Sequence, residues 1–276
     1  MLSSKSIIAS LLSLPIWMGV TGCAESGHEA SKPESENPPL ADFSDAAREL
    51  VEASPEGIAI GEVHGQIASI MLLEAVTEAA LETYPTVLVL HEFTPGEAGL
   101  DITATPKDSF QTYDITDISL PLWTSNIDKR ATWELHAFFE KIAEMPNVSL
   151  SYLWDPRLNP PPNKLKAHGM AVRWKIAREA RPDAYIVALA GNYHTSSSER
   201  YSLEETNSLC RYADEVFNMK LTCVAVDNLV SADENCLPNQ KAVVLKGEDV
   251  FENWDYVIRR PDRCTVQAQW VNEAVK

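Results

Sequence analysis

Short apolar runs that alternate with segments of helical periodicity constrain the fold of this chain more than any other feature. Buried strands are predicted at residues 58–60, 86–90, 148–154 and 184–190, with further strands at 221–226, 242–245 and 256–259. Helices are predicted at 43–53, 66–83, 130–145 and 164–180, and residues 94–126 read as irregular. Ser44 is a possible cap of the first helix, and the second reads as amphipathic. This alternation predicts an α/β fold, with a largely parallel central sheet flanked by helices on both faces.

The length and charge of the chain limit the number of domains and the kinds of partner it can have. Its 276 residues suffice for one sizeable α/β domain and hardly for two, so residues 43–276 are assigned to a single domain. A hydrophobic content of 45% is ordinary for a protein with a packed core. The formal net charge of −17 repels phosphate backbones, so we expect no nucleic-acid partner.

The N-terminal residues indicate export. Lys5 precedes an apolar run at 7–20, which Pro15 interrupts and which is too short for a comfortable membrane span. The run ends in Val20-Thr21-Gly22-Cys23, which resembles the lipobox of bacterial lipoproteins. That resemblance implies a signal peptide at 1–22, a lipid on Cys23, and a cell-envelope location. The location would be the outer membrane in a Gram-negative host, with the domain facing the periplasm or exterior. The alternative is a plain signal peptide with an incidental cysteine.

The segment after Cys23 differs in composition from the rest of the chain. Residues 23–42 are rich in Glu, Ser, Pro and Asn and lack apolar periodicity, which predicts a disordered tether between a lipid anchor and the folded domain. His28 lies in this tether and is not expected to belong to a site.

The remaining cysteines are consistent with an oxidising compartment. They all lie in the C-terminal third of the chain, at Cys210, Cys223, Cys236 and Cys264. An even number predicts two disulfides, for which three connectivities are possible. The alternative is four free thiols in a cytosolic protein, which the export signal disfavours. A zinc site is disfavoured because no pair has C-x2-C spacing.

Polar side chains gather where the predicted buried strands end. Glu62 and His64 follow the first strand, His91 and Glu92 the second, Asp155 the third, and Asn192 and His194 the fourth. Ligands of open parallel sheets bind at the carboxyl ends of the strands. The sequence therefore predicts one shared site at this edge.

The spacing within each pair predicts which side chains face the site. Glu62 and His64 are two residues apart, so in extended backbone they share a face, and Asn192 and His194 are expected to repeat this arrangement. His91 and Glu92 are adjacent, so one of them faces the site. We favour Glu92, which leaves His91 either supporting the site or lying in the core.

Two imidazoles and two carboxylates suit either a metal ion or acid–base chemistry. Glu62, His64, Glu92 and His194 are the predicted catalytic residues and also the predicted ligands of a divalent Mn, Fe, Co or Zn ion. Without metal, a Glu–His pair could activate water as general base. Asn192, Asp155 and His168 are predicted to contact substrate. The alternative is that Glu62 caps the following helix and His64 bonds to local backbone.

Other candidates carry weaker signals. His136 lies among helix aromatics and is expected to be structural or on the surface, while Arg157 and Arg173 could bind an anionic substrate or form ordinary ion pairs. No G-x-S-x-G elbow accompanies Ser196, and the chain has no H-E-x-x-H, G-x-G-x-x-G or P-loop motif.

The order of these motifs resembles the superfamily of erythromycin-esterase-like, ChaN-like and Tiki proteins. Members share a G-E-x-H or G-x-x-H element, a later glutamate, and a second G-x-x-H. Here Gly61-Glu62-Val63-His64, Glu92 and Gly191-Asn192-Tyr193-His194 match them. Met170-Ala171 resembles part of the R-D-x-x-M-A-x-x-I stretch of several members, with Lys166-Ala167 in place of Arg-Asp. The resemblance spans about residues 58–194.

The resemblance implies more than one function. Erythromycin-esterase-like members hydrolyse a macrolide lactone, Tiki members are similar to metal-dependent proteases, and ChaN-like members are lipoproteins associated with haem and iron uptake. We therefore expect an envelope hydrolase of an ester, lactone or amide, acting on a small-molecule or peptide substrate. The alternative is a haem- or iron-binding lipoprotein without catalysis, in which a histidine or Tyr113, Tyr152 or Tyr193 would bind the iron.

Overall fold

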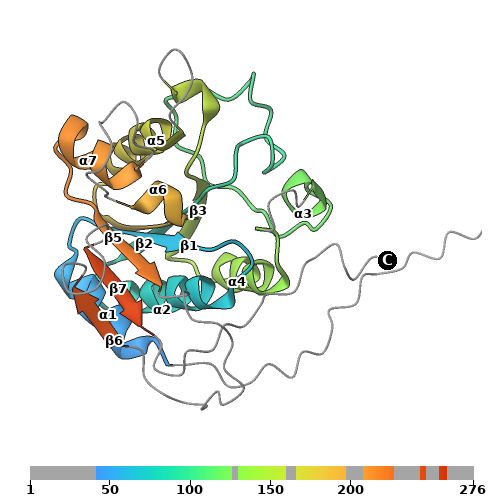
Figure 1. Ribbon diagram of the computed structural model, residues 1–276. Coiled ribbons are helices and arrows are strands. Elements are labelled where there is room, and N and C mark those ends of the chain that lie inside the picture. Colours follow the sequence, from blue (N-terminus) through green and yellow to red (C-terminus); the bar gives the residue numbers. More distant parts are fainter. Residues whose placement is uncertain are drawn as a thin grey trace, which may run out of the picture. The chain divides into compact units, whose positions relative to one another are not determined.

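One twisted sheet organises the part of the chain that the computed structural model describes, which is residues 42–125, 130–159, 166–196, 208–226, 243–246 and 255–259. Within these residues seven strands pair in the order β3-β2-β4-β1-β5-β7-β6 (Figure 1). Their bounds are Ile58–Glu62 (β1), Thr86–His91 (β2), Val148–Tyr152 (β3), Ala184–Gly191 (β4), Thr222–Val226 (β5), Val243–Lys246 (β6) and Tyr256–Arg259 (β7). All neighbours are parallel except β6, which pairs antiparallel with β7. The predicted largely parallel sheet is confirmed.

Helices cover both faces of this sheet, as predicted. On one face lie α1 (Ser44–Ala53), α2 (Ile67–Thr83) and α4 (Trp133–Ala143), where α2 packs on β1, β2 and β4, and α4 packs on β3. On the other face lie α5 (Lys166–Ala180) and α7 (Leu209–Phe217), which share one apolar core with the strands (Figure 1). That core includes Met170 and Trp174 of α5 against Ala188 of β4. Burial on both faces explains why the strands read as continuous apolar runs.

Two details of the first helices differ from the prediction. Ser44 is the first residue of α1 rather than its cap, and its backbone N–H donates to the Asp42 carboxylate at 2.9 Å. The predicted amphipathic character of α2 is wrong, since its buried residues surround much of the helix. The reason is that α2 packs on α1 and α4 as well as on the sheet.

Four short elements were not predicted. They are α3 (Pro121–Ser125), the 3-10 turn η1 (Pro156–Leu158), α6 (Asn192–Thr195) and α7. The segment before α3 is irregular, as expected, but it is anchored by Trp123, whose buried ring N–H donates to the Ile115 carbonyl at 2.7 Å.

A disulfide between Cys210 and Cys223 joins α7 to β5, with the two Cα atoms 6.3 Å apart. Both residues are buried, Cys223 completely. One of the two predicted disulfides is therefore present, and it pairs Cys210 with Cys223. Cys236 and Cys264 lie outside the described residues, as do the predicted signal peptide, Cys23, His28 and the tether.

A search of the described helices for a membrane span gave a negative result, because none of them combines sufficient length with sufficient hydropathy.

Removing the disulfide is expected to destabilise the domain by about 3 kcal/mol, because the bond closes a loop with a sequence separation of 13 in the unfolded chain. The variant that carries both Cys210→Ala and Cys223→Ala should show this loss in urea unfolding monitored by circular dichroism. Adding a reductant should lower the stability of the wild type by more than that of the double variant, which lacks this bond. Free thiols at both positions in a non-reducing digest of the wild type would contradict the bond.

Gly57, which precedes β1, is expected not to tolerate a side chain. Its φ is +118°, and a Cβ there would lie 2.5 Å from the Ile186 carbonyl oxygen and 2.8 Å from the Trp174 ring. Gly57→Ala should lower the free energy of unfolding by about 1–3 kcal/mol, since backbone strain and a clash add. Gly96→Ala is the matched control, because its Cβ would meet nothing closer than Thr94 Oγ1 at 4.0 Å. Equal stability of the two variants would refute the assignment of strain.

Candidate functional site

Three neighbouring strands bring the predicted site residues to one edge of the sheet. β4 lies between β2 and β1, and all three are parallel, so their carboxyl ends coincide. Glu62 is the last residue of β1 and pairs in register with Gly191, the last residue of β4. Glu92 follows β2 directly, and α6 starts immediately after β4. The shared site predicted at the strand ends is therefore formed in part.

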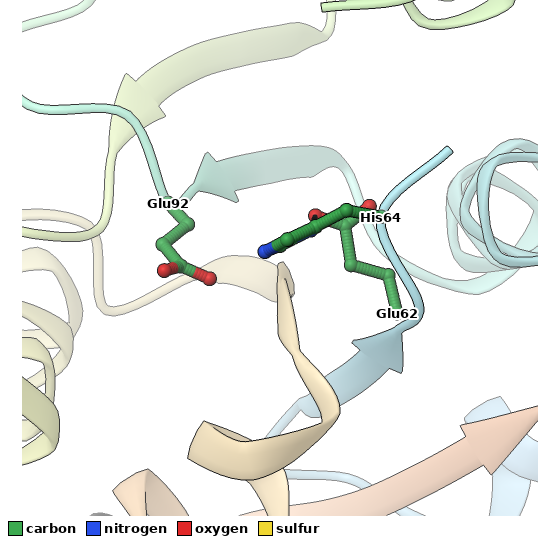
Figure 2. A group of neighbouring side chains, drawn as sticks. All are labelled: Glu62, His64 and Glu92. Carbon is green, nitrogen blue, oxygen red and sulfur yellow. Dashed lines mark hydrogen bonds and ion pairs between the residues drawn. The ribbon is translucent and has the colours of Figure 1, made fainter. Parts of the chain in front are cut away.

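Glu62 and His64 form a hydrogen-bonded pair. The distance from Glu62 Oε1 to His64 Nδ1 is 2.8 Å. Glu62 is buried, whereas the imidazole is 29% exposed. Figure 2 shows the imidazole lying between the two carboxylates, with one ring nitrogen pointing toward Glu92. The predicted common face of these two residues leads here to direct contact.

Burial and hydrogen bonding act in opposite directions on this imidazole. Burial alone would lower the pKa of His64, but the hydrogen bond and negative charge of Glu62, with a further contribution from Glu92, raise that pKa above its usual value. Glu62 therefore strengthens His64 as a base.

Glu92 is almost completely buried, and its two oxygens have different surroundings. Oε2 accepts a hydrogen bond from the Gly191 backbone N–H at 2.6 Å. Oε1 forms an ion pair with Lys166 and lies 3.8 Å from Arg130 Nη1 and 3.6 Å from His194 Nε2. Burial would raise the pKa of Glu92, but the charges of Lys166, His194 and Arg130 lower it to about 2. Glu92 is thus held as a carboxylate at neutral pH.

The Glu62–His64–Glu92 group could hold a metal ion. Each residue offers a ligand atom, and these atoms lie within 4.8 Å of one another. Gly191 borders two of these atoms, since a Cβ there would lie 3.5 Å from His64 Nε2 and 3.6 Å from Glu92 Oε2. Among the described residues, no other set of three histidine, cysteine or acidic side chains has the spacing of metal ligands. It contains three of the four predicted ligands.

The fourth predicted ligand, His194, reaches the site by a different geometry from the one expected. Asn192 and His194 were predicted to share a face of extended chain, which is wrong because both lie in α6. Residues two apart in a helix point in different directions. His194 contacts Glu92, whereas Asn192 Oδ1 is buried against Gly61, where a Cβ would collide with it. Among the described residues, Asn192 Oδ1 has no hydrogen-bond partner.

His91 belongs to the core rather than to the site. It is fully buried, stacks on Phe93 at a centroid distance of 4.1 Å and meets the edge of Phe139 at 5.5 Å. Burial is the main cause that lowers the pKa of His91 well below its usual value, so the ring is neutral. The choice of Glu92 over His91 as the site residue is consistent with this placement.

Asp155 and His168 lie away from the three-residue group. The buried Asp155 carboxylate pairs with Arg157 at 2.6 Å and accepts from the Arg157 backbone N–H at 2.9 Å. His168 packs against Tyr212 and Phe217 of α7, and burial lowers its pKa. Neither is brought into contact with the group.

The other weak candidates are structural. Arg173 is fully buried and lies over the Tyr152 ring at 4.0 Å, with hydrogen bonds to main-chain carbonyls. His136 is also buried and hydrogen-bonds to the Thr116 carbonyl oxygen at 2.7 Å.

Sequence reasoning missed two cations that neutralise Glu92. Lys166 is the first residue of α5, and its ammonium lies 4.1 Å from the centroid of the Trp154 ring. Arg130 precedes α4, is buried, and also donates to the Glu92 carbonyl at 3.2 Å. A single Lys or Arg has no motif of its own. The signal for Lys166 was its place in the resembling motif, where several proteins of that superfamily carry Arg.

The comparisons with known proteins leave the family open. No family model matches the chain, and no curated protein matches it. A solved structure titled "Crystal structure of bacterial protein toxins" aligns with 16% sequence identity and a TM-score of 0.36. The alignment covers 67% of this chain and 36% of that one, so this chain spans little more than a third of its length. A match this distant carries no functional inference.

Lys166→Met is expected to destabilise the metal-free protein at neutral pH by about 2 kcal/mol, the order of one hydrogen bond between charged groups. The folded pKa of Glu92 lies below its unfolded value, so its ion pairs stabilise the fold above pH about 4.5 and lose this effect as the pH falls toward 2. The difference between wild type and variant should therefore shrink in acid. Urea unfolding in EDTA measures it.

Lys175→Met is the control, because the same helix carries Lys175 in an exposed pair with Glu179 at 3.8 Å. Its effect should stay below about 0.5 kcal/mol at every pH. A Lys166→Met variant as stable as Lys175→Met would show that Arg130 and Gly191 suffice to neutralise Glu92.

Proposed function

We propose that the protein is a hydrolase of an ester, lactone or amide, and that Glu62, His64, Glu92 and His194 form its catalytic centre. The observation that carries the proposal is the Glu62–His64 hydrogen bond, which leaves the other imidazole nitrogen pointing toward Glu92 and bordering Gly191. A buried carboxylate bonded to an exposed imidazole is the arrangement of a general base and the group that orients it.

The expected position of the proton on His64 is consistent with its role as a general base. With Glu62 ionised, His64 Nδ1 carries the proton and Nε2 presents a lone pair. Nε2 can take a proton from water as the water oxygen bonds to the acyl carbon. The same proton then passes to the leaving oxygen or nitrogen as its bond to carbon breaks, which yields an acid and an alcohol or amine. Lys166 and Arg130 offset the charge of Glu92, so this carboxylate opposes negative charge that develops on the substrate less than an unpaired one would.

The donor set also fits a divalent metal. Imidazole with carboxylates suits Mn, Fe, Co or Zn, and a ligating histidine commonly donates its other N–H to a carboxylate, as His64 does to Glu62. His64 Nε2 and Glu92 Oε2 flank the space above Gly191 and would hold the ion, with Glu62 orienting the imidazole. When bound, the ion would polarise a carbonyl and lower the pKa of water.

The resemblance to the erythromycin-esterase-like, ChaN-like and Tiki superfamily gains support from the site. Residues from its three motifs, far apart in the chain, lie beside one another at the strand ends. Lys166, which stands where other members carry Arg, contacts Glu92. We further propose, on the sequence of the N-terminus, that the chain is a lipoprotein held to the bacterial envelope through Cys23.

The alternative is a haem- or iron-binding lipoprotein of ChaN-like type without catalysis. Of the three tyrosines considered, Tyr152 is fully buried and Tyr113 has a buried hydroxyl group. Tyr193 is 67% exposed, and its ring lies 5.7 Å from that of His194. Tyr193 and His194 are the pair that would bind iron in this alternative.

His64→Ala is expected to lower kcat for ester hydrolysis by about 10²–10⁴, because the imidazole is either the general base or, with an ion at Nε2, one of its ligands. In the second case the variant should also lose the metal. Metal analysis of the purified protein and assays with para-nitrophenyl and lactone substrates measure the two effects. Glu52→Gln, which removes an exposed carboxylate of α1, should change neither.

Circular dichroism and thermal melting would show whether His64→Ala still folds. A Soret band from stoichiometric haem would favour the alternative. An unchanged metal content and unchanged hydrolysis in His64→Ala would refute the proposed site.

A further inference from the structure

Two exposed apolar side chains lie between the paired polar residues of the candidate site. Among the residues that the structure describes, three large hydrophobic side chains are exposed: Val63 at 39%, Tyr193 at 67% and Val216 at 45%. Val63 separates Glu62 from His64, and Tyr193 separates Asn192 from His194. Val216 lies on α7, away from these strand ends. Val63 and Tyr193 are thus the exposed large hydrophobic residues that adjoin site residues in the sequence.

Val63 and Tyr193 belong to neighbouring strand ends, and together we call them the apolar lip. Glu62 and Gly191 are Cα partners in the β1–β4 ladder, and Val63 and Tyr193 follow one and two residues later. The Tyr193 ring meets the His194 ring at 5.7 Å and 67°, and His194 in turn contacts Glu92. The exposed Tyr193 ring therefore lies directly beside His194, a residue of the candidate site.

The charges around the site argue against recognition of an anionic substrate. Lys166 and Arg130 both form ion pairs with Glu92, and Arg130 also lies 3.5 Å from Glu97. Arg157 and Arg173, once candidates for anion binding, are engaged with Asp155 and with buried main-chain carbonyls. The net charge of −17 repels anions at long range. These charges therefore favour an uncharged substrate over an anionic one.

We infer that the substrate is an uncharged ester or amide whose acyl part carries a long aliphatic or aromatic group, and that Tyr193 and Val63 determine this specificity by packing against it. The inference rests on the proposed function and deepens it. An exposed tyrosine offers a large apolar surface at little cost in conformational entropy. Because the lip lies beside the centre and not within it, it discriminates between substrates without taking part in bond breaking.

A chain-length series tests this inference. The wild type should cleave para-nitrophenyl octanoate and benzoate with a higher kcat/KM than the acetate, by about fourfold for each methylene that becomes buried. Tyr193→Ala should lower kcat/KM for the octanoate by about tenfold or more, and leave the acetate within about twofold. Val63→Ala should act in the same direction with a smaller effect.

Two controls separate the lip from other roles of the same residues. Val216→Ala removes the exposed apolar side chain of α7 and should leave the whole series unchanged. Tyr193→Phe keeps the ring and should retain the preference, whereas an iron-binding phenolate would be lost. All three substituted side chains are exposed, so the four variants should melt like the wild type.

Each outcome bears on the inference in a defined way. A preference for long acyl chains that Tyr193→Ala abolishes supports it. Hydrolysis without chain-length preference, or a preference that survives Tyr193→Ala, overturns it and leaves the proposed function standing. Absence of hydrolysis across the series overturns the proposed function and this inference together.

Discussion

The buried carboxylate of Glu92 is the group on which the arrangement of the site depends. Taking an ionised carboxylate out of water costs several kcal/mol unless charges and hydrogen bonds compensate for it. The compensation comes from three separate elements: the Gly191 N–H of β4, the Lys166 ammonium of α5, and the guanidinium of Arg130 ahead of α4. One charge therefore holds the end of the central strand, the start of a helix on one face, and the approach to a helix on the other. Fold and site share the same interaction.

The strands and the central pair of the site could be predicted from the sequence because their signals are local. Continuous apolar runs mark strands that are buried on both faces, and the polar residues that follow them fall at the carboxyl edge. Glu62, His64 and Glu92 were predicted on that basis, and they meet. The strand order could not be predicted, because nothing in a run such as 184–190 states that it inserts between β1 and β2.

The wrong or missing predictions about the site also have physical causes. Alternation predicts a shared face only where the backbone stays extended, and the chain at Asn192–Thr195 turns into a short helix at once. Asp155 satisfies the strand-end rule, but Arg157 two residues later captures its carboxylate. Lys166 and Arg130 form ion pairs with Glu92 only because the fold brings them together, and this proximity cannot be inferred from their spacing in the sequence. The pairing of the cysteines could not be predicted for the same reason.

The two oxygens of Glu92 bear on whether metal and lysine compete for the same carboxylate. Lys166, Arg130 and His194 all approach Oε1, whereas Oε2 accepts from Gly191 beside the space that His64 Nε2 also lines. A cation in that space would meet Oε2 without displacing Lys166 from Oε1. Because the ammonium stays at the carboxylate in either case, it lowers the affinity for the ion by like-charge repulsion and leaves the imidazole oriented by Glu62. Glu62 would thus orient the imidazole in both cases, as the general base when Nε2 is unligated and as a ligand when Nε2 holds an ion.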